Sequence, residues 1–173
     1  MRSIKLPGFV LLAALFMNFS SPVLKADSFS FTNTLSGGAD VRLFSFTTAS
    51  TGVVDLSTSS YAGGGFSPVL SLFDVGNSGL LIGRDNGVDH PSGDATLSLS
   101  LTTGNYILAL TVFDNLAVGP WLSDGFLRAG DPDFTRDFGA PGNTGSFLNI
   151  DGQPRTGNYN LALNNVALSW RSA

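Results

Sequence analysis

The sequence contains no cysteine and only one histidine, His90. Without cysteine there are no disulfides, no thiolate nucleophile and no cysteine-ligated metal site. A catalytic triad needs an oriented histidine beside a nucleophile, and the chain has no G-x-S-x-G elbow to supply that nucleophile. His90 stands between Asp89 and Pro91 in an expected loop. We therefore predict that the protein is not an enzyme.

Glutamate is also absent, and lysine occurs only within the first 26 residues. From residue 27 onward, six arginines stand against thirteen aspartates, which gives a formal charge of −7. This balance excludes strong binding to a phosphate backbone, which depends on lysine and arginine. Nucleic acid is therefore not an expected partner. Aspartate suits turns because its short side chain bonds nearby backbone, so we expect most of the charge in loops.

The apolar run at the N-terminus has the pattern of a secretory signal. Arg2 and Lys5 precede an apolar stretch from Phe9 to Phe19, and small and polar residues lead to Ala26. We predict cleavage after Ala26. The apolar stretch is shorter than the about 20 residues that span a bilayer, although a retained anchor is the alternative. The expected location is extracellular or periplasmic, with no membrane span after cleavage.

The remainder, residues 27–173, is predicted to be one domain of short strands separated by glycine-containing turns. Apolar and polar residues alternate most clearly at 95–101 and 106–114, which we expect to pair as an antiparallel hairpin. Further strands are predicted at 29–33, 41–47, 52–58, 68–74, 80–85, 159–163 and 166–170. No long 3.6-residue period occurs. The expected fold is all-β, an antiparallel jelly-roll-like β-sandwich.

Residues 115–155 depart from this pattern. The segment is rich in glycine, proline and aspartate and carries scattered aromatic residues. Long connections in a compact domain are usually functional or disordered, and buried aromatic side chains could hold this one in place. We expect an ordered loop with short strands near 125–127 and 146–150.

Three runs of sequence carry a family resemblance. They are DVRLFSFTT at 40–48, YAGGGFSPVLSLFDVGNSGLLIGRDN at 61–86 and LTTGNYILALTVFDN at 101–115. In this order they resemble the bacterial pre-peptidase C-terminal domain. The chain is more similar still to secreted stand-alone relatives of that domain, which add a D-G-F loop and a late R-T-G-N-Y strand, here at 124–126 and 155–159.

The resemblance implies a jelly-roll-like sandwich and a non-catalytic role in calcium binding, substrate association or secretion. Those domains are typically attached to secreted proteases, whereas we expect no protease domain in this chain. Many stand-alone relatives end in a PEP-CTERM sorting tail. This sequence ends NVALSWRSA without such a tail, so sorting by that route is not expected.

Strand directions predict that aspartates gather at one end of the sandwich, with Asp74 at the other. Clustered carboxylate and amide oxygens repel one another unless they share a hard cation, and calcium takes six to eight oxygen ligands. The candidate calcium ligands are Asp85, Asn86, Asp89 and Asp114. The alternative is that these are turn residues facing water, because no complete calcium-loop signature is present. A weaker second set of candidate ligands is Asp131, Asp133 and Asp137. It is weaker because Arg136 lies among them and could form an ion pair with one of them.

The sequence thus predicts a secreted, non-enzymatic binding or structural module, stabilised by calcium in one version of the hypothesis. Its expected partner is an extracellular protein or a polysaccharide, and its oligomeric state stays open. One alternative is a carbohydrate-binding module in which Trp121 stacks on a sugar ring, although the plainer role of Trp121 is to anchor the loop. A second alternative is a hydrolase that uses two aspartates.

Overall fold

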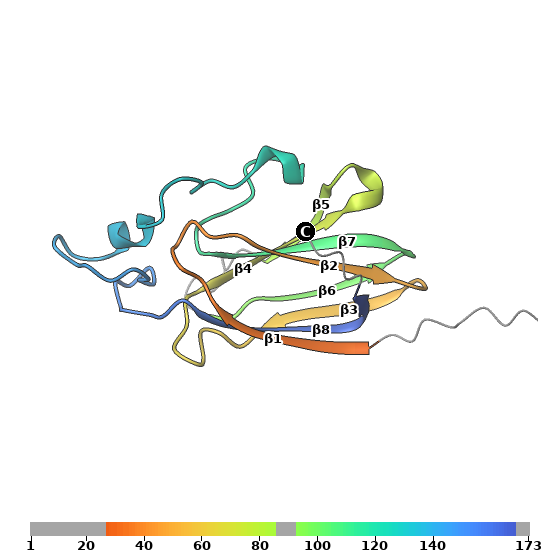
Figure 1. Cartoon of the computed structure of the whole chain (residues 1–173), viewed down its shortest axis with the longest axis horizontal. Coiled ribbons are helices and arrows are strands. Elements are labelled where there is room, and N and C mark those ends of the chain that lie inside the picture. Colours follow the sequence, from red (N-terminus) through yellow and green to blue (C-terminus); the bar gives the residue numbers. More distant parts are fainter. Residues whose placement is uncertain (1–26, 86–92, 169–173) are drawn as a thin grey trace, which may run out of the picture.

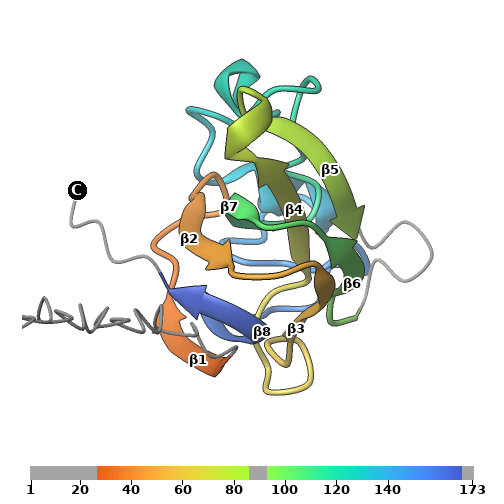
Figure 2. The same ribbon diagram turned by 90° about the vertical axis from the view of Figure 1, so that its right-hand side faces the viewer.

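The strands form an antiparallel sheet that folds over into two layers (Figures 1 and 2). The computed structural model describes residues 27–85 and 93–168. The strands are β1 (Asp27–Thr34), β2 (Arg42–Thr48), β3 (Gly52–Thr58), β4 (Pro68–Asp74), β5 (Leu80–Asp85), β6 (Thr96–Leu101), β7 (Gly104–Val112) and β8 (Asn158–Leu168). Three short 3-10 helices are η1 (Val75–Asn77), η2 (Leu122–Asp124) and η3 (Phe134–Phe138). The predicted all-β antiparallel fold is confirmed.

One layer has the order β5-β4-β7-β2, and the other has the order β1-β8-β3-β6. Both layers contribute leucine and phenylalanine side chains to a shared core, among them Phe46, Leu56, Leu72, Leu108 and Leu161. Within the described ranges, no helix is long and apolar enough to cross a membrane. The predicted signal, residues 1–26, lies outside those ranges.

The last strand, β8, connects the two layers. It pairs with β1 and β3 in one layer and reaches β2 in the other, where Ala167 pairs with Thr47. The prediction of two separate strands, 159–163 and 166–170, is wrong. A bulge at Asn165 shifts the register by one residue, and a single strand continues through it. Asn165 has φ of 64°, which asparagine tolerates better than most residues, and its amide donates to the Val53 carbonyl at 3.1 Å.

The predicted hairpin of β6 and β7 is also wrong. β6 pairs with β3, whereas β7 lies between β2 and β4 in the opposite layer. The turn between them crosses from one layer to the other, and the Tyr106 hydroxyl fixes it by donating to the Thr102 carbonyl at 2.9 Å. Alternation along a strand decides which face is buried but does not decide which strand lies alongside.

The long connection between β7 and β8 covers the outer face of the β4–β7 layer (Figure 1). On that face Phe73 and Ala109 are both 0% exposed, because Ala117, Leu122 and Phe126 of the connection pack around them. Neither predicted short strand forms. Each is reduced to one bridge, Ala117 with Phe126 and Leu148 with Pro154. The connection is therefore a third layer over half of the sandwich.

The covered face predicts a large energetic contrast between a covered apolar residue on β4 and an exposed one on β2. Phe73→Ala should lower the free energy of unfolding by about 3 to 5 kcal/mol, because it opens a cavity beneath the connection. Leu43→Ala, which truncates a side chain that is 53% exposed, should change it by only about 0.5 kcal/mol. Urea unfolding measures both variants. Equal small losses would show that the connection does not cover Phe73 in solution.

Burial also makes stability depend on alkaline pH. Desolvation raises the pKa of Tyr159 above its ordinary value of 10.0, and the positive charge of Arg42 lowers it by less. The unfolded chain therefore releases this proton first, so the stability that Tyr159 contributes is complete below pH 10 and falls as the pH rises further. Tyr159→Phe should lose less stability than the natural chain between about pH 9 and 11 in urea unfolding. Parallel losses would contradict this prediction.

Candidate functional site

The end of the sandwich where β5 and β7 finish, here called the loop end, contains the described candidate calcium ligands. Asp85 closes β5 and Asp114 follows β7, while Asp74 lies at the opposite end, as the strand directions predicted. Asn86 and Asp89 lie outside the described residues, as does His90. In the described part of the chain, no three His, Cys, Asp or Glu residues are grouped to hold a metal.

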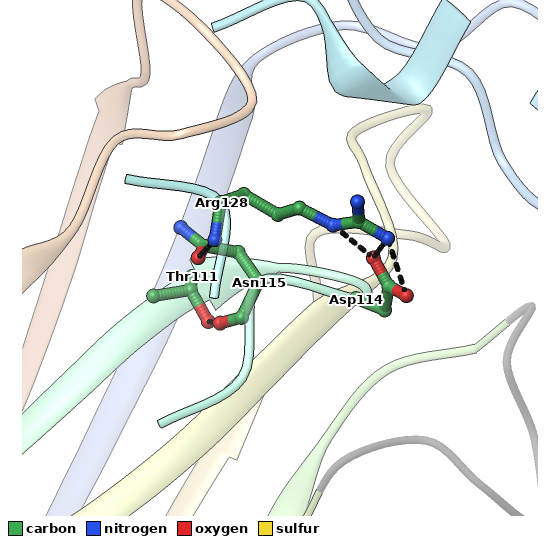
Figure 3. A network of polar contacts seen from close by, with 4 residues as sticks. All are labelled: Thr111, Asp114, Asn115 and Arg128. Carbon is green, nitrogen blue, oxygen red and sulfur yellow. Dashed lines mark hydrogen bonds and ion pairs between the residues drawn. The ribbon is translucent and has the colours of Figure 1, made fainter. Parts of the chain in front are cut away.

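Asp114 is held by an arginine (Figure 3). The Arg128 Nε donates to Asp114 Oδ1 and its Nη2 donates to Oδ2, both at 2.9 Å. The guanidinium lies 5.0 Å from the ring centroid of Phe134. Both carboxylate oxygens thus face a fixed positive charge, which would repel a cation placed at the same oxygens. Asp114 does not fit a calcium ligand while this ion pair is present.

The next residue, Asn115, is 0% exposed and fastens the start of the long connection (Figure 3). Its amide nitrogen donates to the Ala39 carbonyl at 3.2 Å, and its side-chain oxygen accepts from the Arg128 backbone N–H at 2.9 Å. The Thr111 hydroxyl donates to the Asn115 carbonyl at 2.7 Å. Asn115 thus connects the end of β7, the segment before β2 and the long connection.

Asp85 links the two layers at their β5–β6 side. Its Oδ2 accepts from the backbone N–H of Thr96, the first residue of β6, at 2.7 Å. Thr58 N–H bonds the Ala95 carbonyl, so by antiparallel alternation Thr96 directs its own N–H away from β3. Asp85 therefore satisfies a donor on the outer edge of β6. Whether it also binds calcium with Asn86 and Asp89 stays a prediction.

Several other aspartates accept hydrogen bonds from backbone N–H groups in turns. Asp94 accepts from Tyr61 at 2.9 Å and from Ala62 at 3.1 Å. The same use of the carboxylate occurs at Asp40, Asp74 and Asp124. In the weaker metal candidate, Asp133 forms an ion pair with Arg136 at 3.0 Å, the pairing that the sequence suggested.

Trp121 is 38% exposed. It lies in the long connection beside the start of β5, away from the loop end. The backbone around it is fixed, because its N–H donates to Asp124 Oδ2 at 2.9 Å and the neighbouring Leu122 N–H donates to the Gly79 carbonyl at 2.9 Å. This backbone pairs with Leu80 at the start of β5. The predicted stacking residue is thus a partly exposed indole on an ordered backbone.

A second fastening closes the end of the connection and was not predicted. The Arg155 guanidinium lies 3.8 Å from the centroid of the Tyr61 ring, and its Nε donates to the Gly65 carbonyl at 2.8 Å. The Tyr61 hydroxyl accepts from the Asn149 amide at 3.0 Å. A Cβ on Gly65 would lie 2.1 Å from the Asn158 carbonyl oxygen, so the approach requires glycine. Tyr61 and Arg155 each open a run that carries the family resemblance, Y-A-G-G-G and R-T-G-N-Y, and that was the available signal in the sequence.

No family model and no curated protein matches the chain. Among solved structures, the chain is similar to the pre-peptidase C-terminal domain of a collagenase from Bacillus anthracis. The two are 14% identical with a TM-score of 0.43, and the match covers 79% of this chain and 87% of that one. A likeness at this level carries no inference about function.

The calcium prediction has a direct test at the loop end. If Asp85, Asn86 and Asp89 bind calcium, millimolar calcium chloride should raise the melting temperature, because a ligand of the folded state alone stabilises that state. Asp85→Asn should abolish the rise, since the amide still accepts from Thr96 but lacks the charge. Asp74→Asn, at the opposite end, should retain it. A natural chain whose melting temperature does not respond to calcium would contradict the prediction.

Proposed function

We propose that this chain is a secreted, non-catalytic binding module whose ligand is a polysaccharide, bound at the outer side of the long connection around Trp121. The observation that carries the proposal is a tryptophan, 38% exposed, on a backbone held by hydrogen bonds on both sides. Aromatic rings offer sugars a large flat contact at low cost in conformational entropy. A fixed backbone lowers that cost further.

The surroundings of Trp121 support a sugar ligand. Ala117 and Phe126 form a bridge and point inward, so the flanking Val118 and Leu127 face outward and are 62% and 54% exposed. Both belong to the same segment as Trp121 and add exposed apolar side chains to the outer side of the connection. The net acidic charge of the domain favours a neutral or basic polysaccharide over a polyanionic one.

The engagement of the carboxylates supports a non-catalytic role. A two-aspartate hydrolase needs a pair of carboxyl groups roughly 5 to 10 Å apart across an open cleft, one of them available as a nucleophile or base. Asp114 is bound to Arg128 through both oxygens, and Asp94 accepts two backbone N–H groups. These bonds assign the carboxylates to holding turns and loops.

Binding to insoluble polysaccharides tests the proposal. The purified protein should be retained on at least one of cellulose, chitin and xylan, and Trp121→Ala should weaken that binding at least about tenfold, equivalent to about 1.4 kcal/mol. Val53→Ala removes an apolar side chain that is 52% exposed on β3, in the opposite layer, and should bind within about threefold of the natural chain. No retention on any of the three, or equal losses in both variants, would overturn the role of Trp121.

A further inference from the structure

The outer edge of β1 is open in the described structure. β1 pairs with β8 on one side, and no segment within residues 27–85 and 93–168 pairs with its other side (Figures 1 and 2). The other three outer strands, β2, β5 and β6, are partly covered, and at the edge of β2 the strand β8 pairs with Phe46 and Thr47. Pro120 accepts from the Leu81 N–H at the edge of β5, and Asp85 accepts from the Thr96 N–H at the edge of β6. β1 is therefore the least protected edge.

The hydrogen-bond register shows which groups of β1 point outward. Leu35 N–H donates to the Gly157 carbonyl, at the end of the β1–β8 ladder. In an antiparallel pair every second residue bonds the neighbouring strand, so Phe31 and Phe29 bond β8. Ser30 and Thr32 between them direct their N–H and C=O groups to the open edge. Such a row of unpaired backbone groups is a template for another strand.

The side chains of β1 leave that template accessible. Ser28, Ser30 and Thr32 are short and exposed, and the strand contains no proline or lysine, the residues that usually block an edge. Phe29 and Phe31 face the core but stay only half buried, with the Phe31 ring 5.0 Å from that of Phe44. A strand added at this edge would therefore gain backbone bonds and cover apolar surface.

We propose that the partner is a second copy of this chain, paired antiparallel along β1 about a two-fold axis at Ser30. The sequence of β1 is self-complementary in this register, because phenylalanine lies on each side of Ser30. Phe29 then faces Phe31 of the second copy, a favourable cross-strand aromatic pair. Asp27, the only charge in the strand, faces Asn33 rather than another acid. The two β1 layers become one continuous sheet.

The charge and size of this interface set its behaviour. Edge pairing buries less than about 1,200 Å² in total, so the dimer is weak and forms as protein concentration rises. Each copy carries a formal charge of −7 from residue 27 onward, and these charges repel one another. Salt screens that repulsion, so dimerisation strengthens with ionic strength.

Sedimentation velocity over a range of concentrations tests the dimer. The natural chain should shift from monomer to dimer as concentration and salt increase. Ser30→Pro removes an N–H that points away from β8 and bonds no described residue, and it should abolish the shift, whereas Ser30→Ala keeps that N–H and should dimerise normally. The melting temperature of each variant checks that it is folded. A natural chain that stays monomeric, or a folded Ser30→Pro chain that still dimerises, would overturn the proposal.

A single introduced cysteine gives an independent measurement, because the chain has none of its own. In the proposed register the two copies of residue 30 are directly opposite, about 5.5 Å apart between Cα atoms, which suits a disulfide. Ser30→Cys should therefore oxidise to a covalent dimer at least tenfold faster than Ser100→Cys, an exposed position on the same layer at β6. Equal rates of dimer formation in the two variants would contradict pairing at β1.

Discussion

The structure depends on the need to bury both faces of the β4–β7 layer. The sequence PVLSLF of β4 is buried along its whole length, which one core alone cannot achieve for a strand whose side chains alternate between two faces. The inner face meets the opposite layer, and the connection between β7 and β8 covers the outer one. Removing that cover would expose Phe73 and Ala109 to water.

The connection needs fastening because it has little regular structure of its own. At its start, Asn115 and the Asp114–Arg128 ion pair bind it to the end of β7 and to the segment before β2. At its end, Arg155 packs over Tyr61 and bonds Gly65, which fixes the entry to β8. Between these points the backbone around Trp121 pairs with the start of β5. The same segment thus completes the fold and presents the exposed indole.

The two layers differ in what they offer to solvent. The connection covers one outer face, while the outer face of the β1–β8–β3–β6 layer shows short hydroxyl, amide and carboxylate side chains, among them Thr32, Asn160 and Ser98. Thr32 bonds Asn160 and Ser98 bonds Asp55, while Val53 of β3 is an exposed apolar side chain on the same layer. We therefore expect contacts with other molecules at the connection, which exposes Trp121, and at the β1 edge, which has backbone groups without a partner strand among the described residues.

The positions of the strands could be predicted from the sequence, because alternation and glycine turns are local signals. Seven of the predicted ranges begin and end within two residues of an observed strand. The sequence also determined which end of the sandwich receives Asp85 and Asp114, since strand direction follows from connectivity. Only the tertiary structure decided that β6 and β7 belong to opposite layers, that Arg128 binds Asp114, and that Arg155 meets Tyr61. Arg128 and Arg155 belong to the long connection, and the course of that connection decides which residues they meet. No local sequence pattern indicates which distant residue lies beside them.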